Sequence, residues 1–419
     1  MAEIDLLLFH FVWSSRKHLV SKETLIQPLA QGGLKMPSVE YVVKTAKIMW
    51  IKRMTNNIQT GWKVMAEELM GMSIRELSEN KLFVYVKPRI KTAYYSDLLS
   101  IWFDFLKPKL NNINDLIHQK LFNNPAFTIN RKIISAGSRE WEVAGFTYVS
   151  DILQNDNKFR SKLDIERRFS ITISDMQYNQ LVSVITSKLR ILPKHCHYTQ
   201  IDYYEVLPMK CLDNFSKITS AQIYRYFLSQ GKTTPTSQNK WIEYYPFLET
   251  LEWKNVYLLP SKIVQDTYLI TLQFKILHRV FACNYKLFIW KIKDTPNCTV
   301  CDKIDNLEHY FYYCTDTYNF WRQVQKWLCH LLSYYLSLTI LEVLLGVINC
   351  DPRYYYIINY VIIIGKYYIS QSKKKQKDIS FFNFLHTLKQ KLRLDERVHI
   401  KQDCLPRFVE KFGILSDSI

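Results

Sequence analysis

The segment NCTVCDKIDNLEHYFYYC, residues 297–314, holds three cysteines and one histidine within eighteen positions. Their spacing is Cys298-x2-Cys301-x7-His309-x4-Cys314. Two cysteines that flank two residues can bind one ion from a tight turn, and His309 and Cys314 can complete a tetrahedron from a following helical turn. Zinc suits this set because it accepts thiolate and imidazole ligands together. The spacing predicts a structural zinc ion with four protein ligands, and coincident free thiols are the alternative.

The residues between and beside these ligands predict how the module packs. The seven residues between Cys301 and His309 leave room for residues 302–306 to loop out while Leu307 points inward. The aromatic run 310–313 is expected to pack against the segment that contains Phe320 and Trp321. Stacking of these rings on unpaired bases is the alternative.

The other six cysteines are scattered along the chain. They are Cys196, Cys211, Cys283, Cys329, Cys350 and Cys404. They lack the paired spacing of a disulfide framework, so we expect a reducing compartment, the cytoplasm or the nucleus. His195, Cys196 and His197 are too close in sequence to bind one tetrahedral ion together.

The rest of the sequence predicts helices. Only 10 glycines and 13 prolines occur in 419 residues, too few for the many tight turns of an all-β sandwich. Ser174 with Gln177, and Thr219 with Gln222, have the spacing of a capping box, and Gly231 is expected at the C′ position. We therefore predict a mainly α fold of several helical subdomains, with a small Cys3His zinc module inserted near the C-terminal helices.

A long amphipathic helix is expected over residues 260–281. Its apolar stripe contains Ile263, Thr267, Ile270, Phe274, Leu277 and Phe281. The solvent face is expected to carry Lys262, Gln265, Gln273, Lys275 and Arg279. Another helix is expected after the N-cap Ser380, with Phe381, Leu385, Leu388 and Leu392 on its apolar face.

Five regions are expected along the chain. They are a helical segment (1–60), a middle helical region (61–230), a polar linker (231–240), a helical region with the zinc module at 298–314 (241–330) and C-terminal helices with a basic segment (331–419). The apolar stretches 327–350 and 354–365 are interpreted as two buried core helices rather than membrane spans. The second has twelve residues, fewer than the roughly 20 of a span, and the first would bury Glu342 in lipid.

The charge balance predicts polyanionic partners. The formal net charge is +18, and residues 366–401 carry ten Lys and Arg against three acidic residues. Phosphate contacts are predicted for Arg279, Lys291, Lys293, Lys373, Lys374, Lys375 and Lys377. RNA, DNA or both are the expected partners, and a solvated basic face is the alternative. The sequence identifies no protein partner.

Catalytic motifs are missing from the sequence. It contains no HExxH, GxSxG or GxGxxG motif and no Asp-Asp dipeptide. No catalytic residue can be assigned, so we expect a protein that is not an enzyme.

Several stretches, taken in order, resemble the C-terminal part of the reverse transcriptase polyprotein of LINE-type (non-LTR) retrotransposons. The first, residues 9–50, looks like the family's thumb region and matches it at Trp13, Gly32, Gly33, Leu34, Pro37 and Tyr41. The second, residues 121–153, matches at Asn123, Asn124, Trp141, Gly145, Asp151 and Ile152. The stretch FKILHRVFACNYKLFIW with the cysteine–histidine array resembles the family's zinc-binding region, and residues 380–392 resemble its closing helices.

The resemblance implies an accessory role in target-primed reverse transcription, in which this region grips RNA and DNA. The aromatic-x-Asp-Asp motif of the family's polymerase and the carboxylates of its endonuclease are not matched, so neither activity is carried over. The chain therefore looks like a non-catalytic remnant or part of such a protein. A host-adopted protein-interaction module and a relic without function are the alternatives.

The lack of an Asp-Asp pair generates a first prediction. Two-metal nucleotide transfer needs clustered carboxylates to hold its ions, so the purified chain should not extend a primer on an RNA template with magnesium and deoxynucleotides. Gel analysis should show no product above background, and robust extension would refute the expectation.

Overall fold

The computed structural model describes residues 2–13, 19–56, 60–74, 77, 87–106, 116–117, 119, 121–122, 124, 126–129, 132–134, 139–154, 158–190, 217–231 and 233–419. These residues are mainly helical, as predicted. Asn123, His195, Cys196, His197 and Cys211 lie outside this set. Two compact units are formed, one from Met1–Asp5 with Ser38–Gly231 and one from Leu6–Pro37 with Lys232–Ile419.

The first unit contains a helical core built on α3 (Val39–Met54), which packs on α6 (Ala93–Leu106) and α13 (Ser220–Gln230). The helix α4 (Gly61–Met70) packs on α6. The 3-10 helix η3 (Lys87–Arg89) lies between α4 and α6 in the sequence. Trp102, Phe105, Tyr226 and Phe227 fill this core.

A second core in the first unit is formed by α8 (Arg139–Val143), α9 (Val149–Ile152), α10 (Lys162–Phe169) and α11 (Asp175–Leu189). A short antiparallel pair, β1 (Thr128–Ile129) and β2 (Lys132–Ile133), accompanies them with Thr128 opposite Ile133. Phe122, Trp141 and Phe146 pack as a ring cluster at its centre. Trp141, which carries part of the family resemblance, is thus a core residue.

The expected helix starts are confirmed. Ser174 Oγ accepts from Gln177 N at 3.2 Å while Gln177 Oε1 accepts from Ser174 N at 3.0 Å. Thr219 and Gln222 form the same reciprocal pair. Gly231, in contrast, is the C-cap of α13 with φ −96°, not a left-handed C′ residue. A Cβ there would lie 2.6 Å from Tyr41 Oη, so the close approach of Tyr41 favours glycine.

The second unit begins with most of α1 (Ala2–Trp13), then α2 (Lys22–Leu25) and the 3-10 helix η1 (Leu29–Gln31). Its later part contains α14 (Thr236–Tyr244), η5 (Pro246–Thr250), α15 (Trp253–Ile263), α16 (Thr267–Leu277), α17 (Asn284–Ile289), the π-helix η6 (His309–Tyr313), α18 (Thr315–Leu332), α19 (Ile340–Leu345), α20 (Tyr355–Lys374), α21 (Phe381–Lys401) and α22 (Leu405–Ser418). Residues 236–240, expected in a linker, instead begin α14, and Trp241 in that helix is fully buried.

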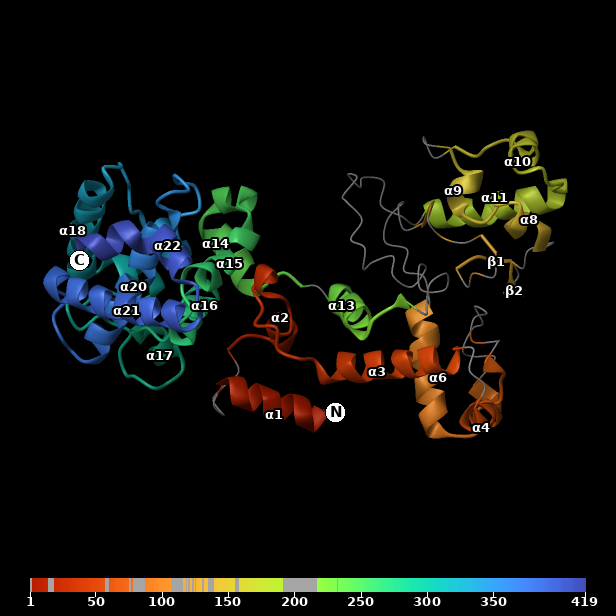
Figure 1. The fold of residues 1–419 in the computed structure, drawn as a ribbon, viewed down its shortest axis with the longest axis horizontal. Coiled ribbons are helices and arrows are strands. Elements are labelled where there is room, and N and C mark those ends of the chain that lie inside the picture. Colours follow the sequence, from red (N-terminus) through yellow and green to blue (C-terminus); the bar gives the residue numbers. More distant parts are fainter. Residues whose placement is uncertain are drawn as a thin grey trace. The chain divides into compact units, whose positions relative to one another are not determined.

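The helix α20 is the centre of this unit (Figure 1), where α15, α16, α21 and α22 pack on it. Residues 357–364 are buried at every position, so this helix has no solvent face along its first half. Its apolar run explains this, because a helix that is hydrophobic all round must be enclosed. Among the described residues no helix is long and apolar enough to cross a membrane.

Two expected helices are divided in the structure. The predicted helix 260–281 breaks at Val264, which is extended, and Asp266 caps a new helix by accepting from Tyr268 N at 2.9 Å. Because the second helix starts anew, a different set of residues faces the core. Thr267 is exposed, and Gln273 is buried and donates to Leu344 O at 2.7 Å. The stretch 327–350 is likewise divided into the end of α18 and the separate helix α19. Thr339 and Glu342 form a capping box at the start of α19.

The predicted helix after Ser380 is α21. Ser380 is its N-cap without a side-chain cap bond, and its backbone N–H donates to Tyr368 Oη at 2.9 Å. Leu388 and Leu392 are buried with Phe384, and Phe381 and Leu385 are partly buried. The predicted apolar face therefore packs on the core.

The close fit of α20 against α18 generates a prediction. A Cβ on Gly365 would lie 2.6 Å from Trp321 Cη2, and the indole is 1% exposed, so Gly365→Ala should destabilise the protein by about 1–3 kcal/mol. The control is Gly413→Ala in α22, where the new methyl meets only Val409 Cγ1 at 3.5 Å. It should raise stability by about 0.4–1 kcal/mol. Urea unfolding measures both, and equal effects would contradict the packing.

Candidate metal centre

A tight turn carries the first two cysteines. Asn297 and Ile304 form an isolated antiparallel bridge, and Cys298 N donates to Lys303 O at 2.8 Å. The turn between them requires Asp302 to adopt φ 54°, a left-handed conformation that aspartate tolerates better than most residues. Val300 N donates to Cys298 Sγ at 3.5 Å, so the backbone of the turn contacts this sulfur directly.

The histidine and the last cysteine lie at the two ends of a π-helical turn. Asn306 Oδ1 accepts from His309 N at 2.8 Å and so caps this turn. Cys314 N donates to His309 O at 3.1 Å, five residues back. In an α-helix, residues five apart diverge by about 140° around the axis. The wider π-turn brings them close to one line, so His309 and Cys314 face the same point.

The four donor atoms come together as the spacing predicts. All of them lie within 4.8 Å of one another. Cys298 Sγ and Cys314 Sγ are 3.8 Å apart, which matches the about 3.8 Å expected for two sulfurs bound tetrahedrally to zinc at 2.3 Å. Cys301 Sγ and His309 Nε2 are 3.2 Å apart, somewhat less than the roughly 3.6 Å of a tetrahedral zinc pair. The Cys3His group can hold a metal ion such as zinc.

Burial shifts the pKa of two of these ligands, Cys314 and His309. It raises the pKa of the Cys314 thiol to about 12, and nearby Cys298 adds to the rise while Lys373 opposes it. Burial also lowers the pKa of His309, against the opposing pull of Asp305. His309 is therefore a neutral imidazole near pH 7, as a metal ligand must be. A metal ion has to displace the Cys314 proton, so binding should release protons.

A buried carboxylate ties the module to α17. Asp305 is 2% exposed, and its Oδ2 accepts from Asn284 N at 3.2 Å. Its main chain accepts from Tyr285 N and donates to Pro296 O. The expectation that residues 302–306 all loop out is therefore wrong for Asp305, because its side chain and backbone form hydrogen bonds with residues 284–285 and with Pro296. Sequence reasoning missed this residue, since only the fold reveals its partners.

Aromatic packing holds the module on the core. Leu307 is buried, as predicted, and so are Tyr310 and Phe311. Trp321 Nε1 donates to Phe311 O at 2.7 Å, so the predicted packing against this segment is confirmed for the first half of the run. Phe281 contacts both buried rings, with centroids 5.0 and 4.9 Å away. Tyr313, in contrast, remains 55% exposed.

A groove of about 360 Å³ lies beside the module. Four of the seven cations that were predicted to contact phosphate line it: Lys293, Lys373, Lys374 and Lys377. Lys375 and Lys291 are exposed outside this lining. Three carboxylates also line the groove: Asp305, Asp316 and Asp378.

Two of the predicted cations are held by the fold. Lys373 donates to Tyr310 O at 2.8 Å and lies 4.3 Å from the centroid of that ring, so it anchors the end of α20 to the module. Arg279 was expected on a solvent-facing helix surface, and this is wrong. It follows α16 with φ 55° and pairs with Glu308 at 2.7 Å, so its side chain is only 14% exposed.

Comparison with models of known protein families finds no match, and no curated protein is detectably similar to the chain. The chain is a helical protein with a Cys3His cluster.

The donor geometry generates a prediction for the intact protein. It should bind one equivalent of Co²⁺ with the absorption of a tetrahedral thiolate site, and Cys301→Ser should abolish that signal. Because Cys314 must lose a proton, the apparent affinity should fall as the pH is lowered from 8 to 6. The matched control is Cys404→Ser, at a thiol outside the group. Octahedral cobalt, or a Cys301→Ser variant that binds as well as the parent, would contradict the site.

Proposed function

We propose that the chain binds single-stranded RNA or DNA through phosphate contacts in the groove beside a structural zinc module. On this proposal it is a non-catalytic C-terminal part, or remnant, of a LINE-type retrotransposon reverse transcriptase that grips nucleic acid during target-primed reverse transcription. The ordered resemblance of separate stretches supports the family, and the Cys3His geometry supports the zinc ion.

One observation carries the binding proposal. Lys293, which follows α17, and Lys374 and Lys377, at the end of α20, are eighty or more residues apart in sequence and line one groove. Lys374, Lys375 and Lys377 are all exposed, so their ammonium groups are available to a polyanion. Each phosphate that they neutralise would release condensed counterions, which drives association at low salt.

The role of the zinc ion in this proposal is structural. Four protein ligands leave no open coordination position for an activated water. By fixing the turn at Cys298, the ion would hold one wall of the groove, since Cys298, Thr299 and Val300 line it with the lysines. Loss of metal should therefore weaken nucleic-acid binding without the removal of any phosphate contact.

The salt dependence of binding tests the proposal. Replacing the groove lysines Lys293, Lys374 and Lys377 by alanine should flatten the slope of log K against log salt by roughly two to three units, at about 0.7–0.9 per lost contact. Lys373 is left in place because it holds Tyr310. Fluorescence polarisation of a labelled single-stranded RNA gives the slope.

The matched control replaces Lys254, Lys262 and Lys401, which are exposed on other elements and lie outside the groove. This variant loses the same charge and should keep most of the slope. Equal losses in the two variants would show general charge attraction. If the parent does not bind nucleic acid, the protein-interaction alternative is favoured.

A further inference from the structure

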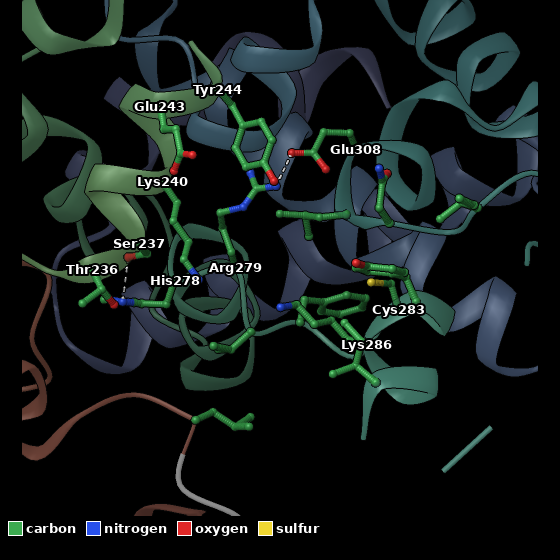
Figure 2. A pocket seen from close by; sticks show the side chains of 18 of the residues that line it. Thr236, Ser237, Lys240, Glu243, Tyr244, His278, Arg279, Cys283, Lys286 and Glu308 are labelled. Carbon is green, nitrogen blue, oxygen red and sulfur yellow. Dashed lines mark hydrogen bonds and ion pairs between the residues drawn. The ribbon is translucent and has the colours of Figure 1, made fainter. Parts of the chain in front are cut away.

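A second pocket, of about 860 Å³, is lined by residues of α14, α17 and the segment 304–308, and Figure 2 shows its side chains. Its volume is in the range of small-molecule and cofactor sites, about 300–1,000 Å³. None of the groove lysines belongs to it. It is therefore a separate site with its own chemistry.

Three cations from three elements line this pocket. Lys240 comes from α14, Arg279 from the turn after α16, and Lys286 from α17 (Figure 2). Burial lowers the pKa of Lys286, and the positive charges of Lys240 and Arg279 lower it further. The cations are thus close enough to repel one another, an arrangement that an anion between them would stabilise.

The Arg279 side chain is fixed with one donor unused. Its guanidinium lies 4.4 Å from the Trp241 ring centroid and 4.8 Å from that of Tyr244. Nη2 pairs with Glu308, and among the described residues the buried Nη1 has no hydrogen-bond partner. Buried donors are rarely left without a partner, so Nη1 is a candidate donor to a ligand that the described residues do not provide.

His278, which also lines the pocket, is held by two hydrogen bonds and carries no charge. His278 Nε2 donates to Gly32 O at 2.8 Å, so its Nδ1 accepts from Ser237 Oγ at 3.2 Å. Burial lowers the pKa of His278 to about 4, and this histidine is therefore neutral near pH 7. The positive charge of the pocket comes from Lys240, Arg279 and Lys286.

Exposed aromatic rings stand at the same pocket. Tyr244 is 64% exposed and Tyr313 is 55% exposed, although Trp241 in α14 and Tyr310 and Phe311 in η6 are buried. Exposed aromatic faces beside cations are the usual platform for unpaired bases. Glu308 forms an ion pair with Arg279. Glu243 is the other carboxylate that lines the pocket and can accept hydrogen bonds from N–H groups of a ligand. A bare inorganic anion would use neither the rings nor Glu243.

We propose that this pocket binds one unpaired nucleotide, with its phosphate between Lys240 and Lys286 and its base against Tyr244. The inference rests on the proposed nucleic-acid function and names what this pocket would recognise. The pocket would hold a single nucleotide, while the lysine groove would bind the phosphate backbone. The bound phosphate relieves the repulsion among the three cations. Glu243 then favours a base edge that carries N–H donors, such as that of guanine.

The test uses the zinc-loaded full chain and nucleoside 5′-monophosphates, with the quenching of tryptophan fluorescence as the readout because Trp290 lines the pocket. The monophosphate should bind at least tenfold more tightly than the same nucleoside and than inorganic phosphate. Lys286→Gln and Tyr244→Ala should each weaken binding about tenfold, and Tyr244→Phe should restore it because the ring is kept. The controls Lys262→Gln and Tyr335→Ala, at exposed positions outside the pocket, should bind as the parent does.

The outcomes separate the two proposals. If single-stranded RNA binds with a steep salt slope but no monophosphate binds, the pocket proposal fails and the groove remains. If monophosphates bind equally to the parent, Lys286→Gln and Tyr244→Ala, the pocket proposal also fails. If the monophosphate binds and RNA does not, the pocket stands and the polymer function fails.

Discussion

A helix that is enclosed on every side needs a partner surface around its whole circumference, and α20 imposes this requirement on the C-terminal unit. Four helices, two before it in sequence and two after it, pack on α20, and its glycine at position 365 admits the Trp321 ring. Even Lys366 is buried, so its pKa is far below the usual lysine range, and its amine lies 3.5 Å from Leu344 O. The end of the same helix carries Lys373, which contacts the module. The position of the candidate metal centre thus depends on the burial of α20.

The cysteine–histidine module contributes residues to two differently built sites. Residues 298–300 face the lysine groove, while residues 306–308 line the pocket with Arg279 and Lys286. The groove offers exposed ammonium groups without aromatic faces that are open to solvent. The pocket combines fixed cations with exposed rings. The same module therefore lines one site that offers exposed charges and another that combines charges with aromatic rings.

Local signals in the sequence were sufficient where a few neighbouring residues decide the structure. The capping pairs at Ser174 and Thr219 and the four metal-ligand positions are of this kind, since each depends on spacing alone. The division of helix 260–281 was not predictable from its apolar stripe, because Asp266 competes as an N-cap in the middle of a continuous pattern. The roles of Arg279 and Asp305 depend on Glu308 and Asn284, partners that only the tertiary fold brings near. For the same reason the pocket had no sequence signal.

The π-helical turn between His309 and Cys314 has a consequence for how this segment can change over generations. The number of residues in this turn is what aligns the two ligands. Their alignment requires four residues between them and a hydrogen bond that spans five positions. Exchanges of one residue for another at the exposed Tyr313 leave that register intact. Loss or gain of a single codon within 310–313 rotates one ligand away from the other three. The number of residues in this segment should therefore stay fixed, even where the exposed Tyr313 is exchanged.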